Sequence, residues 1–356
     1  MMEKKLHKRN HNIDFLRGIA ALCIVLIHTA WWSGTTYLPS WFSNLTLLID
    51  VPVFMFLSGM SFHYVQSIQK NLKSIFSQWK KWLYFLIFYC LLLLFFFRDN
   101  FYISDIFSWI VYLFPHNNQL PVVGGSMWYM IMYVEVTIIC SIIICTIRRY
   151  YKHTEEKCLK FIIGILLLIF FYCASEGSSL PIQSTVPFYA IIYLLGYLLS
   201  QYKMKDWKQL LLFEGINILI LLLVCICFHY GINDIQGIKF PPTVAYLPFA
   251  MISILLFWYL KDHLKLKKEN WIHQVGKRAI YFYYAQGVSA SLLYFIYPHI
   301  PFHNWVIVFI CMLLCNLLGT TLGAFLLEKS YQYFQQKIKF DKLKKRISPY
   351  FKLNKI

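Results

Sequence analysis

Long runs of apolar residues alternate with short polar segments along the whole chain. Most runs have about the length that a helix needs to cross a bilayer, roughly 20 residues, and none shows the two-residue alternation of a membrane β-strand. The pattern therefore predicts an all-α, polytopic membrane helix bundle with about ten transmembrane helices. The predicted spans are residues 12–32, 42–65, 82–97, 126–147, 159–174, 186–200, 209–229, 243–260, 279–297 and 304–328.

The basic residues predict the orientation of these spans. If the N-terminus is cytoplasmic, the inner segments are 1–11, 66–81, 148–158, 201–208, 261–278 and 329–356. All but three of the 34 Lys and Arg residues then lie in these segments or, as Lys160 does, beside one. The exceptions are Arg17 at the inner edge of the first span, and Arg98 and Lys239 outside. Cytoplasmic loops are enriched in Lys and Arg, so both termini are predicted to be cytoplasmic.

Composition and charge exclude other classes of protein. With 59% hydrophobic and only 14% charged residues, the chain is unlike a soluble domain, in which roughly a quarter of residues are charged. The net charge of +18 follows from the inner loops and requires no nucleic acid partner. We predict a basic N-terminal segment over 1–11, one transmembrane domain over 12–328 and a basic cytoplasmic tail over 329–356. The ten cysteines show no metal-ligand spacing, so no metal site is predicted.

Ionisable residues inside the predicted spans are the first candidates for a functional site, because burying them in a bilayer is costly. Arg17 and His28 are eleven residues apart in the first span. On a helix this spacing puts them about 20° apart around the axis and about 16 Å apart along it. They therefore share one face at two depths. The other ionisable residues in or at the spans are Asp14, Asp50, Glu135 and Glu214.

The chemistry of Arg17 and His28 suits transfer of an acyl group from a long donor with a phosphate head. A guanidinium at the cytoplasmic boundary can bind phosphate, and an imidazole deeper in the membrane can accept a proton from an alcohol. A covalent acyl-histidine is the less favoured role. The structural alternative is that Arg17 only marks the cytoplasmic boundary and that His28 packs between helices.

Several segments resemble the acyltransferase family 3 membrane proteins. The sequence Asn12–His28, NIDFLRGIAALCIVLIH, is similar to the opening helix of that family and contains its pattern of Arg, ten residues and His. Residues 51–59, VPVFMFLSG, and 126–130, SMWYM, resemble its second-helix and fourth-helix segments. Residues 276–286 resemble a late segment that often has serine where Ala279 stands and histidine where Gln286 stands. The resemblance implies acyl transfer from coenzyme A, usually of acetyl, onto an extracytoplasmic carbohydrate, in a bacterial cytoplasmic membrane.

Five further residues are candidates around the same site. We expect Asp50 to contact His28 and hold its tautomer, as carboxylates commonly do for catalytic imidazoles, unless it bonds only to backbone or water. Lys73 and Trp128 are candidates for binding the donor, and Ser58 and Glu135 for binding the acceptor. Inner lysines, interfacial tryptophans and small helix residues also have purely structural roles.

The predicted function is that of a membrane O-acyltransferase with an acyl-CoA, expected to be acetyl-CoA, as donor substrate and no permanently bound cofactor. Its expected partners are acyl-CoA, a carbohydrate acceptor and the lipid bilayer, with a separate extracytoplasmic transferase as a further candidate partner. The alternatives are a transporter or flippase of lipid-linked sugars and an acyl-group translocator that feeds such a transferase. No role is assigned to Glu214, Gln286 or Glu328.

Overall fold

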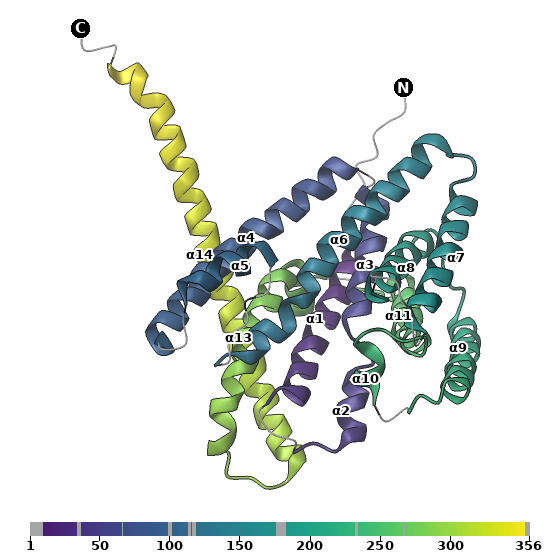
Figure 1. The fold of residues 1–356 in the computed structure, drawn as a ribbon. Helices are drawn as coiled ribbons and strands as arrows, with labels where there is room; N and C mark the ends of the chain where they lie inside the picture. Colours follow the sequence, from purple (N-terminus) through teal and green to yellow (C-terminus); the bar gives the residue numbers. More distant parts are fainter. Residues whose placement is uncertain are drawn as a thin grey trace.

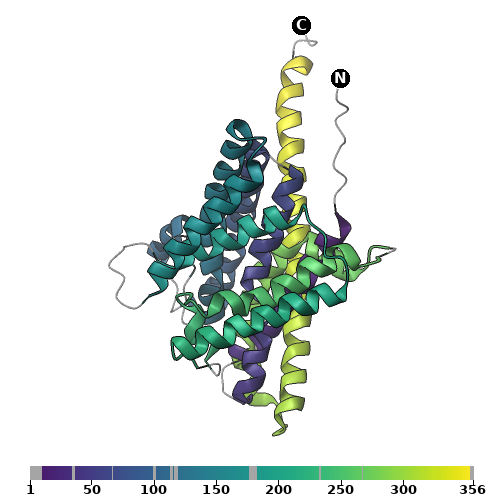
Figure 2. The same cartoon turned by 90° about the vertical axis from the view of Figure 1, so that its right-hand side faces the viewer.

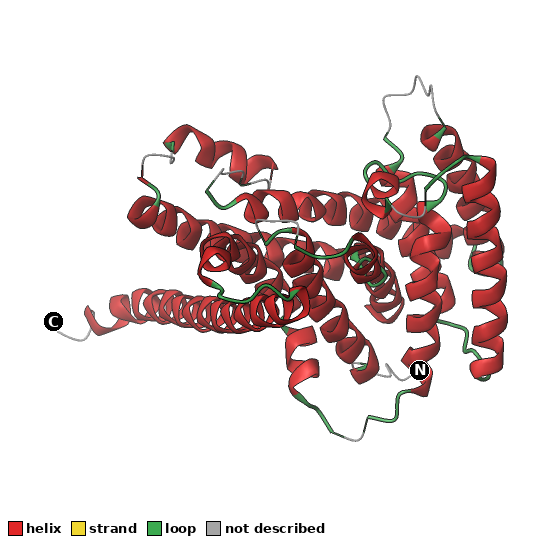
Figure 3. Cartoon of the chain, turned by 90° about the horizontal axis from the view of Figure 1, so that it is seen from below, coloured by secondary structure: helices red, strands yellow, loops and turns green. Residues whose placement is uncertain are grey.

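The computed structural model describes nine stretches of the chain, in which every regular element is helical (Figure 3). The predicted all-α fold class is therefore confirmed. The predicted basic N-terminal segment lies almost entirely outside the described residues. The described residues are 10–33, 37–65, 67–98, 102–112, 115, 119–175, 183–231, 234–266 and 268–352.

In the described residues, a long helix overlaps each of the ten predicted spans, although the span predicted over 42–65 is interrupted and the short helix Ser40–Thr46 precedes the long one in it. These helices are α1 (His11–Trp31), α3 (Val51–Val65), α4 (Ile68–Phe96), α6 (Pro121–Tyr150), α7 (Glu155–Ala174), α8 (Thr185–Leu199), α9 (Trp207–Cys227), α11 (Tyr246–His263), α13 (Ala279–Ile296) and α14 (Trp305–Lys352). Shorter elements connect them: α2 (Ser40–Thr46), α5 (Ile103–Tyr112), α10 (Ile235–Lys239), α12 (Trp271–Lys277) and the 3₁₀ helix η2 (Tyr297–His299).

Two helices extend well beyond their predicted spans. α4 begins at Ile68, because the Ser67 side chain caps it by accepting a hydrogen bond from the Lys70 N–H. α14 continues through the predicted tail to Lys352 and projects away from the bundle, on the side where α1 begins (Figures 1 and 2). An apolar window detects only the part of a helix that crosses hydrocarbon, so the polar ends of α4 and α14 were missed.

Seven described segments are long and apolar enough to cross a membrane, which shows a multi-pass membrane protein. α8, α11 and α13 fall outside this set because they are shorter or less apolar. In α13 the reason is visible, since its polar residues Gln286, Ser289 and Ser291 face the interior of the bundle. The count of ten spans thus stays a prediction, supported by the positions of all ten helices.

Pairs of glycines allow two close helix crossings that shape the bundle. A Cβ atom at Gly59 of α3 would overlap the Tyr193 carbonyl oxygen of α8, and one at Gly196 would overlap the Phe56 carbonyl. Small residues commonly allow such backbone contact between membrane helices. Gly18 and Gly276 do the same where α12 crosses the first half of α1. α1 is thereby fixed beside the α12–α13 segment.

The second half of α1 is held by a buried polar side chain of α14. Asn316 donates hydrogen bonds to the Thr29 hydroxyl at 2.9 Å and to the Val25 carbonyl at 3.3 Å. The Ser289 hydroxyl of α13 donates to the Asn316 carbonyl at 3.1 Å. α1, α13 and α14 are therefore connected at the depth of His28.

Candidate active site

One cavity of about 2000 Å³ runs along α1 and is lined by both Arg17 and His28. The structure thus brings the two residues to one space, as their spacing predicted. Residues of α3, α4, α6, α7, α8, α10, α12 and α13 also line it. The cavity has an Arg17 end, near the start of α1, and a His28 end, near its last turn.

Two neighbours hold Arg17 in place at its end of the cavity. One guanidinium nitrogen, Nη2, donates a hydrogen bond to the Ser61 hydroxyl of α3 at 2.8 Å. The other, Nη1, lies 3.5 Å from a carboxylate oxygen of Asp14, which is buried. The Ser61 hydroxyl in turn donates to the Leu57 carbonyl at 2.7 Å. Arg17 is therefore fixed in orientation while it still faces the cavity.

Three lysines join Arg17 in the wall of the cavity: Lys70 and Lys81 from α4, and Lys277 from the end of α12. Lys277 is placed here because the preceding residue, Gly276, packs against the Asp14 backbone. Asp14 lies beside Arg17 and Glu269 beside Lys277, so the four cations still give this end a net positive charge. Such a surface favours an anionic ligand.

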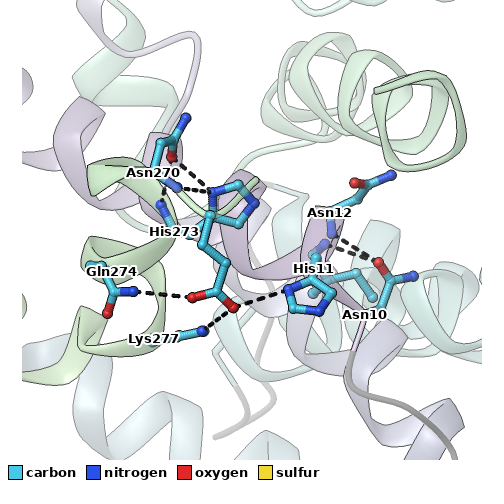
Figure 4. A network of polar contacts seen from close by, with 9 residues as sticks. Asn10, His11, Asn12, Asn270, His273, Gln274 and Lys277 are labelled. Atoms are coloured by element: carbon cyan, nitrogen blue, oxygen red, sulfur yellow. Dashed lines mark hydrogen bonds and ion pairs between the residues drawn. The ribbon is translucent and has the colours of Figure 1, made fainter. Parts of the chain in front are cut away.

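A polar network outside the cavity orients Lys277 (Figure 4). Glu269 accepts a hydrogen bond from the Lys277 ammonium at 2.5 Å and lies 3.2 Å from Nδ1 of His11. The bond from Lys277 holds the pKa of the Glu269 carboxyl below its usual value. Asn270 and His273 form a capping box that starts α12. The network ties the start of α1 to the helix that carries Lys277.

At the other end, the partner of His28 is Gln286 of α13. His28 Nδ1 and the Gln286 side-chain oxygen are in hydrogen-bond contact. Gln286 is only 1% exposed and lies behind His28, since it is not among the described residues that line the cavity. No role was predicted for Gln286, and the contact joins two residues that are 258 positions apart in the sequence.

Asp50 makes other contacts than the predicted one with His28. Its carboxylate forms an ion pair with Lys239 of α10 and accepts hydrogen bonds from the Tyr246 hydroxyl at 3.3 Å and the Val51 N–H at 2.7 Å. Lys239 and Asp50 both still act electrostatically on the imidazole. The depth of Asp50 in the bundle could be predicted from its position in the sequence, but the direction of its side chain could not. Lys239, one of the few basic residues expected outside, is buried as its counter-ion.

The His28 end is rich in aromatic and uncharged polar groups. Trp128 of α6 contacts the ring of Phe240 edge-on, with 4.9 Å between centroids, and Phe240 directly follows Lys239. This places Trp128 at the His28 end, near Lys239 and away from the four cations of the Arg17 end. The wall here also contains Trp31, Trp32, Gln183, Ser184, Thr185 and Gln236.

The remaining candidate residues divide into one that lines the cavity and two that do not. Ser58 lies in the wall on α3, and its hydroxyl donates to the Phe54 carbonyl at 2.8 Å. Lys73 and Glu135 are exposed and are not among the described lining residues. Because Lys70 and Lys277 line the cavity, they take the donor-binding place that was expected for Lys73. Glu328, to which no role was assigned, pairs with Arg278 at 3.0 Å.

Comparison with known proteins gives one match. A family model of the acyltransferase 3 type, described as an acyltransferase domain, matches residues 10–327, which include the ten predicted spans except for the last residue of the tenth. No curated protein and no solved structure matches the chain.

Proposed function

Because the chain belongs to acyltransferase family 3, we propose that it transfers an acetyl group from coenzyme A to a carbohydrate hydroxyl across a bacterial cytoplasmic membrane. The observation that carries this proposal is the single cavity, with fixed cations at one end and His28 at the other. The donor enters from the cytoplasm at the Arg17 end. The acceptor enters from the opposite side at the His28 end.

The donor is bound through its phosphates by Arg17, Lys70, Lys81 and Lys277. Ser61 and Asp14 hold the Arg17 guanidinium, so little side-chain freedom is lost when it binds a phosphate. The separation of about 16 Å along α1 between Arg17 and His28 suits a donor that is long and thin. The thioester then lies at the depth of His28 while the phosphates stay near the cytoplasm.

His28 acts as general base in the transfer step. It takes the proton from the acceptor hydroxyl as that oxygen attacks the thioester carbonyl carbon. The tetrahedral intermediate collapses with cleavage of the carbon–sulfur bond, and the imidazolium returns the proton to the leaving thiolate. The products are an O-acetyl ester and free coenzyme A.

The acceptor is proposed to be an uncharged sugar. Aromatic rings and amide or hydroxyl side chains, of the kind that surround the His28 end, stack on and hydrogen-bond to carbohydrate. The charges of Asp50 and Lys239 cancel there. We therefore assign Trp128 to the acceptor and not to the donor, and place Ser58 between the two substrates. Glu135 lies outside this arrangement.

Turnover of radiolabelled acetyl-CoA by the purified protein in nanodiscs, with crude envelope glycans as acceptors, tests the proposal. Wild type is expected to release coenzyme A and label the glycans. His28→Ala is expected to lose both while it still binds coenzyme A. Glu135→Ala is the control, because its side chain lies outside the cavity. Well-folded wild type that consumes no thioester would overturn the proposal and favour transport of lipid-linked sugars.

A further inference from the structure

We propose that Gln286 is a positioning residue, which fixes the tautomer of His28 so that its Nε2 atom is the base that faces the acceptor. This inference rests on the proposed function, because it concerns the same imidazole. Gln286 thereby takes the role that was first expected for Asp50, which was to hold the tautomer of His28.

The contact is built from two rigid helices. Gln286 and His28 meet across the α13–α1 boundary, and Asn316 of α14 contacts a side chain close to each of them in the sequence. Asn316 binds Thr29, the residue after His28, and its carbonyl accepts from Ser289, one turn after Gln286. The two side chains therefore keep their approach without the help of a loop. Preorganisation of this kind is what a catalytic base requires.

The donor and acceptor capacities of the two groups then define the tautomer. An amide oxygen only accepts hydrogen bonds, so the imidazole nitrogen that faces it, Nδ1, must carry the proton. The second nitrogen, Nε2, is then unprotonated and able to accept a proton. Because His28 lines the cavity and Gln286 lies behind it, Nε2 is the nitrogen directed toward substrates.

The charge balance around His28 explains why an amide suits this position. The titratable groups that face the imidazole are Lys239 of α10 and Asp50 at the start of α3, and they are paired with each other. Gln286 adds no charge, and neither of its side-chain atoms is titratable. The imidazolium formed during catalysis is therefore not stabilised by a neighbouring free carboxylate, which favours rapid return of the proton to the thiolate.

The opposite orientation of the Gln286 amide would place the imidazole proton on the other nitrogen of His28. If the amide nitrogen donated to Nδ1, the proton would lie on Nε2 and the nitrogen facing the cavity would be no base. In the observed orientation the amide nitrogen, Nε2 of Gln286, is buried without a hydrogen-bond partner. Substitution by glutamate separates the two cases, because a carboxylate can accept but not donate.

The experiment compares kcat, KM and the pH profile of thioester turnover for wild type, Gln286→Glu and Gln286→Met. We expect Gln286→Met, which removes the acceptor, to lower kcat roughly ten- to hundredfold with KM for the donor unchanged. Gln286→Glu is expected to keep kcat within a few-fold at its optimum. Its acid limb moves to higher pH, because the carboxylate stabilises the imidazolium and more of His28 is protonated at a given pH. Glu135→Ala, whose side chain lies outside the cavity, is the control and should leave the pH profile in place.

Two results would overturn the inference. Wild-type kcat and pH profile in Gln286→Met would mean that Gln286 only fills space. Lower activity in Gln286→Glu than in Gln286→Met would mean that the amide donates to His28. The tautomer is also measured without turnover, from the ¹⁵N chemical shifts of labelled histidine assigned with His28→Ala. An Nε2-protonated His28 in wild type refutes the inference, whereas absent turnover with an Nδ1-protonated His28 refutes only the proposed function.

Discussion

The buried ion pair between Lys239 and Asp50 allows a prediction whose size follows from the structure. The two side chains are 6% and 4% exposed, so water cannot replace a missing partner. Removing one member of a buried pair typically costs about 3–5 kcal/mol, because the other charge is left uncompensated. Replacing both with apolar residues of similar volume is often close to neutral.

The two single variants should not be equally unstable. In Lys239→Met, the Asp50 carboxylate keeps its hydrogen bonds from Tyr246 and Val51, so we expect a loss near the lower value, about 3 kcal/mol. In Asp50→Leu, the Lys239 ammonium keeps the Phe240 ring at 4.7 Å as its remaining described contact. The loss should then approach about 5 kcal/mol. The double variant should lie within about 1–2 kcal/mol of wild type.

Thermal unfolding of the four proteins in detergent measures these differences. At about 2 °C per kcal/mol for a chain of this size, the single variants should unfold roughly 6–10 °C below wild type. The double variant should recover most of that loss. Single variants that unfold within a degree of wild type would show that the pair is not buried as described. A double variant no more stable than Asp50→Leu would refute the reasoning from charge compensation.

Three further predictions concern other parts of the bundle. Lys70→Ala should raise KM for acetyl-CoA several-fold with little change in kcat, whereas Lys73→Ala, three residues away and outside the cavity, should leave both constants unchanged in the same turnover assay. Gly59→Leu should prevent the close α3–α8 crossing, at a cost of about 1–3 kcal/mol or more, and should appear as a lower yield of monodisperse protein in size-exclusion chromatography. The bond from Lys277 lowers the pKa of Glu269, so its stabilising effect is complete above about pH 4.5 and is lost as the pH falls through the lowered pKa. Glu269→Gln should therefore unfold at a lower temperature than wild type at pH 7, and the difference should vanish in acid; an equal difference at both pH values would contradict this.

The sequence predicted features that depend on one helix at a time. Apolar runs located all ten helices, and helical periodicity placed Arg17 and His28 on one face of α1, in agreement with their shared cavity. The helix ends were less predictable. Residues 68–81 continue α4 through a segment in which polar residues, four of them lysines, outnumber the apolar ones, so it contains no apolar run of spanning length.

The contacts between helices could not be predicted from apolar runs and helical periodicity. The position of Asp50 in the sequence indicated its depth in the bundle. The direction of its side chain depends on how α3 packs, and the carboxylate points to Lys239. Lys239 stood out as one of two basic residues in the predicted outer loops, a signal that its charge has a partner. Gln286 lay in a segment that resembled the family, yet nothing local in the sequence indicated that it meets His28.

In the proposed reaction, the donor and the acceptor reach one cavity from opposite sides of the membrane. Proteoliposomes with the protein in one orientation, defined by an accessible tag after α14, test it directly. Radiolabelled acetyl-CoA is supplied only on the tag side and the glycan acceptor only on the other. We predict that label reaches the enclosed acceptor in wild type, and not in His28→Ala. Transfer only when both substrates are on the same side would contradict the proposed transfer of the acetyl group across the membrane.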